Sequence, residues 1–173
     1  RSSPRVAAIS WVEAYTRLEP AGLPPAKPVR EWDALALRGE HAAVGIVISN
    51  CTDQSRQGSL SLSGLAPAQL TCQARQQVFV EDWYLREKRR TADPLPLLEQ
   101  REGAWRFDLP PGGAVKLHLD LLVSPQATGE ARAAAQVTVI GAEPTTLRLK
   151  LRTPPVAAPA TGFQHLAFMY HTV

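Results

Sequence analysis

The chain has 173 residues, with 19 basic and 16 acidic side chains, a formal net charge of +3, 15 prolines and 11 glycines. This length suits one domain, and a hydrophobic content of 45% excludes wholesale disorder. No apolar run approaches the ~20 residues that a membrane-spanning helix needs, so we expect no membrane span.

The N-terminal residues predict a strand followed by a connector. Trp11 and Tyr15 lie within residues 5–18 and favour a strand there. Prolines then crowd residues 19–28, which excludes a helix or a central strand. We therefore predict that residues 1–28 form a strand and a proline-rich connector. Residues 29–173 are predicted to form a β-sandwich domain, with the N-terminal strand as part of the same structural unit.

Alternating apolar and polar side chains predict strands along the rest of the chain. The clearest run covers residues 115–121, where Lys116, His118 and Asp120 alternate with apolar residues. Further β-prone runs lie at residues 35–37, 44–48, 59–63, 74–84, 105–107, 131–140, 147–151 and 163–173. Turn residues separate these runs and no long helical period occurs. We predict an all-β fold, an antiparallel β-sandwich of about eight strands that is immunoglobulin-like or jelly-roll-like.

Residues 85–103 interrupt this pattern. Pro94 and Pro96 do not fit within a central strand, so we expect an irregular loop that packs against the body. The basic cluster at residues 86–90 lies in the same segment. It is short and has no interleaved aromatic residues, so it is interpreted as a solvated loop and we expect no nucleic-acid partner.

The sequence contains no pattern typical of a catalytic centre. It has no P-loop, nucleophile elbow or H-E-x-x-H motif. The adjacent acids Glu81 and Asp82 would point to opposite faces of a strand and could not flank one sugar. His165 and His171 would lie about 20 Å apart along a strand, too far to share a metal. We expect no enzyme activity, no cofactor and no metal site in this chain.

Cys51 and Cys72 are the only cysteines, and each lies at the edge of a predicted strand. A disulfide between neighbouring strands is one interpretation and would imply an oxidising compartment. Two small buried apolar residues are the other.

Aromatic side chains are the remaining candidates for binding, because flat rings can stack on sugars. The candidate carbohydrate contacts are Trp32, Trp83, Tyr84 and Trp105. The alternative is that the tryptophans fill the core. Trp83 and Tyr84 are neighbours and would face opposite sides of a strand, so one of the two is expected outside.

Three patches resemble a known family. Residues 35–48 (LALRGEHAAVGIVI), 92–97 (ADPLPL) and 119–139 are similar to segments of the β-sandwich domain that precedes the barrel in glycoside hydrolase family 123 and in related proteins with a DUF4091-type barrel. Gly45 stands where that pattern commonly has Gln. The resemblance implies a non-catalytic accessory domain of a larger secreted or periplasmic carbohydrate-active protein. The catalytic acids of the family lie in the barrel, so none is transferred to this chain.

Two other functions stay open. An autonomous carbohydrate-binding module would bind a polysaccharide through an exposed pair of aromatic rings. A protein-interaction or chaperone-like sandwich would expose an apolar edge strand. The accessory-domain hypothesis instead predicts a downstream catalytic barrel in the same protein as the partner.

Overall fold

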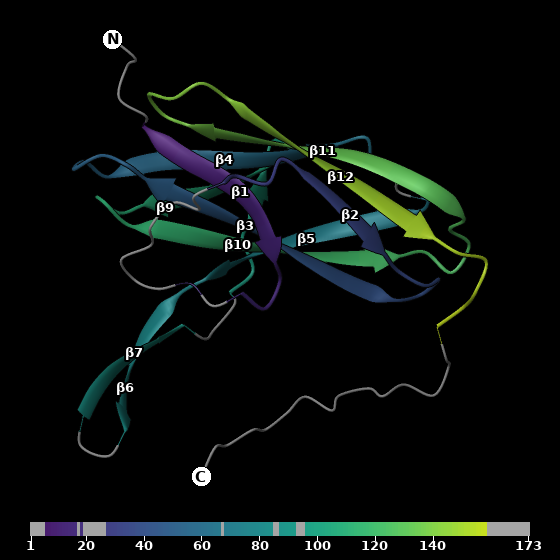
Figure 1. Ribbon diagram of the computed structural model, residues 1–173, viewed down its shortest axis with the longest axis horizontal. Coiled ribbons are helices and arrows are strands. Elements are labelled where there is room, and N and C mark those ends of the chain that lie inside the picture. Colours follow the sequence, from purple (N-terminus) through teal and green to yellow (C-terminus); the bar gives the residue numbers. More distant parts are fainter. Residues whose placement is uncertain are drawn as a thin grey trace.

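The computed structural model is an all-β molecule built from two packed sheets (Figure 1). It describes residues 6–16, 18, 27–66, 68–84, 87–92 and 96–158, and for residues 79–92 it describes only the backbone. The predicted all-β sandwich is confirmed. No helix among the described residues is long and apolar enough to cross a membrane.

The two sheets have the strand order of an immunoglobulin-type sandwich. The first sheet contains, in spatial order, β1 (Ala7–Glu13), β3 (His41–Asn50), β10 (Ala114–Val123) and β5 (Leu70–Gln77). The second contains β2 (Glu31–Leu35), β12 (Thr145–Thr153), β11 (Gly129–Val139), β4 (Arg56–Ser63), β9 (Ala104–Leu109) and β8 (Gln100–Arg101). Strands β1-β3-β10-β5 take the positions of an ABED sheet, and β12-β11-β4 those of a GFC sheet.

One strand pair departs from the predicted antiparallel arrangement. β2 runs parallel to β12, with Trp32 opposite Leu149. The chain leaves the first sheet after β1 and joins the edge of the second sheet as β2, so its direction is set by this crossing and not by a hairpin. Such mixed edges are common in large sheets.

Strands β6 to β9 form an insertion between β5 and β10. Within it, β6 (Phe79–Tyr84) and β7 (Glu87–Ala92) pair as a separate antiparallel hairpin, which extends from the sandwich in Figure 1. The expectation of an irregular loop at residues 85–103 is therefore wrong for residues 87–92, which hold most of the basic cluster, and for residues 100–101 of β8. The prolines lie between these two strands in the sequence and interrupt neither. The predicted strand at residues 163–173 lies outside the described residues.

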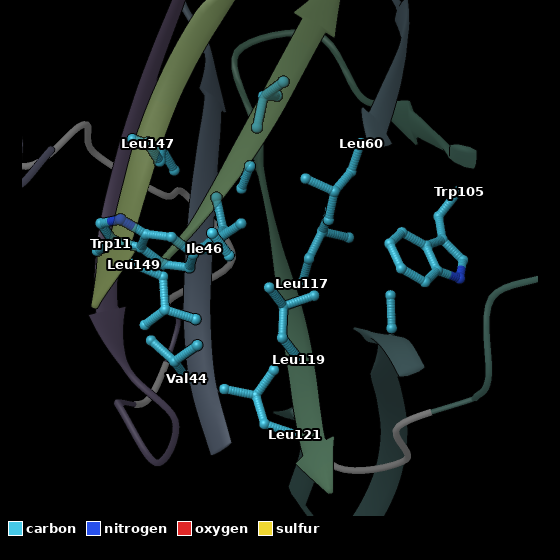
Figure 2. Packing of buried hydrophobic residues seen from close by; sticks show 14 of the residues in the cluster. Trp11, Val44, Ile46, Leu60, Trp105, Leu117, Leu119, Leu121, Leu147 and Leu149 are labelled. Carbon is cyan, nitrogen blue, oxygen red and sulfur yellow. The ribbon is translucent and has the colours of Figure 1, made fainter. Parts of the chain in front are cut away.

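The core forms where the inner faces of the two sheets meet. Alternation along β10 points Leu117 inward, opposite Ile46 of β3, and Ile46 in turn lies opposite Trp11 of β1. Leu60 and Leu147 reach the same cluster from the second sheet (Figure 2). The inner positions of β10 are fully or almost fully buried. Burial of this kind contributes about 1.5–3 kcal/mol for each large aliphatic side chain.

Truncating Leu117 to alanine should remove the centre of this core. We expect Leu117→Ala to lower the free energy of unfolding by about 2–5 kcal/mol, because it combines lost burial with a cavity. Urea denaturation monitored by tryptophan fluorescence measures this change. Leu35→Ala is the matched control, because Leu35 is largely exposed and its loss should change stability by less than about 0.5 kcal/mol. Equal effects of the two substitutions would contradict the packing described.

Candidate functional site

The outer face of the first sheet carries a row of polar side chains that is covered by the chain itself. Lys116 and His118 alternate with the core leucines of β10 and therefore point away from the core. They are nevertheless buried, with only 3% of Lys116 and 7% of His118 exposed. A second apolar cluster on this face explains the cover, because Leu18 packs there with Val47 and Ala114. The segment that follows β1 thus folds back over the sheet.

The Lys116 ammonium group holds this covering segment in place. Its Nζ donates hydrogen bonds to the carbonyl oxygen of Ala14 and, at 2.6 Å, to that of Thr16. Burial lowers the pKa of Lys116 from its ordinary value, because desolvation disfavours the charged form. A buried cation is tolerated only where hydrogen-bond acceptors compensate for lost water. Here the two acceptors are backbone carbonyls, so the lysine acts as a clamp.

Gly45 provides the space through which the lysine passes. A Cβ at this position would lie 2.9 Å from Lys116 Cε and 2.8 Å from Val12 Cγ2, both closer than carbon atoms can approach without displacement. The glycine faces His118 across the β3–β10 ladder. Glycine at this position therefore has a packing reason within this chain.

A second charged group lies further along the same face. Arg75 Nε of β5 donates a 2.7 Å hydrogen bond to Asp120 Oδ2, and His118 Nε2 lies 3.1 Å from Asp120 Oδ1. The carboxylate thus joins two neighbouring strands. The side chains of Arg75 and Asp120 are each only partly exposed. Solvent therefore screens the attraction between them less than it would for a pair on an open surface.

These groups hold chain segments together. The two oxygens of Asp120 face His118 and Arg75, and the ammonium group of Lys116 is committed to two carbonyls. Among the described residues no three His, Cys, Asp or Glu side chains lie close enough to share a metal ion. The hydrogen bonds of Lys116 fix the segment that covers the outer face of the first sheet.

The outer face of the second sheet is an open, charged surface. A groove of about 750 Å³ crosses β2, β12, β11 and β4. Its charges are paired: Arg148 Nη1 lies 3.0 Å from Glu31 Oε1, and Lys150 Nζ lies 3.0 Å from Glu130 Oε2. Hydrogen bonds from Arg132 and then Lys150 lower the pKa of the Glu130 carboxyl group. Exposed pairs of this kind contribute little to stability.

The four predicted carbohydrate contacts have different outcomes in the structure. Trp105 is 5% exposed and lies in the core opposite Leu60, so its ring is not available to a sugar (Figure 2). Trp32 borders the groove on β2, but it is partly buried and packs against the core. Trp83 and Tyr84 fall in β6, where the side chains lie outside what the structure describes. Core filling, the alternative interpretation, therefore applies to Trp105.

The predicted disulfide is contradicted by the register of the first sheet. Both cysteines are free. Cys72 lies opposite Leu121, which lies opposite Ala42, and Cys51 is nine positions beyond Ala42 along the chain. At the rise of a strand the two thiols are about 30 Å apart, and β10 lies between their strands. Burial, and then the Asp120 charge, raise the pKa of the Cys72 thiol to about 12.

Sequence reasoning treated Tyr15 as a strand residue and missed its position. β1 ends at Glu13, and Tyr15 lies in the turn beyond it. The segment contains no glycine, proline or asparagine that would have signalled a turn. The turn forms because Lys116, a residue distant in sequence, binds the carbonyls on either side of it.

Comparison with solved structures found several similar chains. The chain is similar to a family 123 glycoside hydrolase from Clostridium perfringens, with a TM-score of 0.62 and 10% identity over 88% of this chain and 28% of that chain. A FixG-related protein from Vibrio parahaemolyticus has a TM-score of 0.48 and 11% identity, over 88% of this chain and 98% of that chain. A human PapD-like domain has a TM-score of 0.39 and 12% identity, over 92% of each chain.

These likenesses concern the fold. This chain spans little more than a quarter of the hydrolase that it matches. No family model matches the sequence, and no curated protein sequence matches it. The architecture expected from the resemblance, a β-sandwich that recurs as one region of a larger glycoside hydrolase, is thus found at the level of fold.

Replacing Gly45 with alanine should displace the lysine clamp. We expect Gly45→Ala to lower the free energy of unfolding by about 1–3 kcal/mol, the usual effect of overpacking. In a Lys116→Ala background the same substitution should cost less, because one of the two clashing side chains is gone. Urea denaturation of the four variants of this cycle measures the coupling. An equal cost in both backgrounds would contradict the close contact.

The two thiols should differ sharply in reactivity. We expect the native protein at pH 8 to react rapidly with Ellman's reagent at Cys51 alone, because Cys51 is exposed and the Cys72 thiol stays protonated. Both thiols should react in denaturant without added reductant. A Cys51→Ser variant should show no rapid native reaction. Absence of any reactive thiol in unreduced, denatured protein would restore the disulfide.

Proposed function

We propose that this chain is a non-catalytic accessory β-sandwich domain of a larger, secreted or periplasmic carbohydrate-active protein. In that protein it would pack on a catalytic barrel. Two observations support the proposal. Residues 35–48, 92–97 and 119–139 resemble the sandwich domain of glycoside hydrolase family 123, and the fold is shared with about a quarter of one such enzyme.

The non-catalytic role is supported by the contacts of the charged groups on the outer face of the first sheet. Catalytic groups need a free lone pair or proton directed at a substrate. The Lys116 ammonium group instead binds backbone carbonyls from beneath a covering segment, and Asp120 is held between Arg75 and His118. Both arrangements face other parts of the chain.

The edge strands weigh against the chaperone-like alternative. The edge of β1 that does not pair with β3 is hydrogen-bonded to the chain itself, because Trp11 N donates to Val29 O at 3.0 Å. The free side of β5 is covered in the same way, with Leu98 N donating to Ala74 O at 2.9 Å. At the edges of the second sheet, β2 is short and carries two acidic residues, and β8 has two residues. Covered, short and charged edges resist pairing with another chain.

The autonomous carbohydrate-binding alternative has weaker support from its original residues. It needs at least two exposed rings in one plane. Trp105 is buried, and Trp32 is partly buried against the core.

The proposal is tested by the reading frame that encodes this chain and by the activity of its parts. We expect the frame to continue into a barrel-sized region, and the complete product to hydrolyse aryl glycosides or oligosaccharides. The 173-residue chain should release no product from the same substrates. A reading frame that ends at Val173, or turnover by the isolated chain, would contradict the proposal. Asp120→Asn is the control for any trace activity, because Asp120 carries the half-buried carboxylate that binds Arg75.

A further inference from the structure

Tyr15 is the most exposed large hydrophobic side chain among the described residues, at 92%. It lies in a turn that is closed by a 3.1 Å hydrogen bond from Thr16 N to Glu13 O. An aromatic ring in this position gains nothing from burial in the fold. Single exposed apolar residues are common on protein surfaces, so the exposure of Tyr15 becomes informative only together with the support beneath it.

That support is the lysine clamp. Lys116 binds the carbonyls of Ala14 and Thr16, the residues on either side of Tyr15. Leu18, further along the segment, is anchored in the small cluster with Val47. A buried ammonium group and an apolar anchor thus fix the backbone that carries the exposed ring. Fixing a contact residue in advance lowers the entropy lost on binding.

We propose that Tyr15 is a carbohydrate contact, with its ring stacked on the apolar face of one sugar unit. Glu13 and Thr16, both exposed on the same turn, would offer a carboxylate and a hydroxyl group to the sugar hydroxyls. The choice of ligand class rests on the proposed function, and the ring adds a contact outside the barrel that the accessory domain would accompany.

The surroundings of the ring favour a sugar over a protein partner. A stable protein interface needs roughly 800 Å² from each partner and a hydrophobic centre. Around Tyr15 the described neighbours on the turn are polar at the surface, and Leu18 is turned inward. One ring beside a carboxylate and a hydroxyl group matches a single sugar unit of a chain bound mainly elsewhere, whereas an autonomous binding module would need two coplanar rings.

Binding by the purified chain tests the proposal. Affinity gel electrophoresis would use soluble glucan, xylan, mannan, polygalacturonate and glycol chitin, with titration of any polysaccharide that retards the protein. We expect retardation by at least one polysaccharide. Tyr15→Ala should weaken it about tenfold, the scale of one aromatic contact. Tyr15→Phe, which keeps the ring, should retain binding within about twofold by the same reasoning.

Two further variants separate the ring from its support. Lys116→Met keeps Tyr15 but frees the turn, and should weaken binding while circular dichroism shows a folded sandwich. Ile140→Ala removes an exposed apolar residue elsewhere and should leave binding unchanged. Tyr15→Ala alone decides the question if Lys116→Met fails to fold, because Tyr15 makes no core contact.

Three outcomes would overturn the inference. These are the absence of binding to any of the polysaccharides, binding that survives Tyr15→Ala unchanged, and dimerisation in sedimentation velocity that depends on Tyr15, which would assign the ring to a second copy of the chain. None of them bears on the proposed accessory role, which the reading frame and the hydrolysis assay test separately.

Discussion

Burial of residues 114–118 of β10 on both faces is the constraint on which the rest of the structure depends. A strand in a two-layer antiparallel sandwich normally has one wet face. In this chain the inner face of β10 meets the second sheet, and its outer face at Ala114 and Lys116 is covered by the segment that follows β1. The ammonium group of Lys116, which points away from the core, is therefore shielded from water, and two backbone carbonyls accept its hydrogen bonds.

Several local features follow from that burial. Gly45 leaves space for the lysine side chain, and Asp120 joins β10 to β5 through Arg75. The charged groups of this face thus hold neighbouring strands and the covering segment together. Tyr15 is the one large ring that the same clamp presents to solvent.

The alternation of side chains was sufficient to predict the sandwich and the inner face of β10. It also placed Lys116 and His118 on the opposite face, which is correct. It could not show that this face is covered, because the covering segment is distant in sequence and has no local turn signal. The interpretation of Cys51 and Cys72 as a disulfide was wrong for a related reason. The positions of strand ends along the chain do not give the register, and the register places the two cysteines far apart.

The aromatic candidates show the same limit. Trp105 and Phe107 share the buried face of β9, but the sequence left Trp105 open between a sugar contact and the core, and Tyr15 appeared to continue a strand that in fact ends at Glu13. Both outcomes depend on tertiary structure: Trp105 is buried in the core formed by the two sheets, and the turn that carries Tyr15 is held by the hydrogen bonds of Lys116.

Hydrogen exchange over residues 11–18 tests the clamp most directly. The Thr16 amide donates to Glu13 O and the Trp11 amide to Val29 O. If Lys116 fixes this segment, the Thr16 amide should be protected in the wild-type chain and lose its protection in Lys116→Met, while the Trp11 amide stays protected in both. Rapid exchange at Thr16 in the wild-type chain, or equal protection in the two proteins, would contradict the clamp.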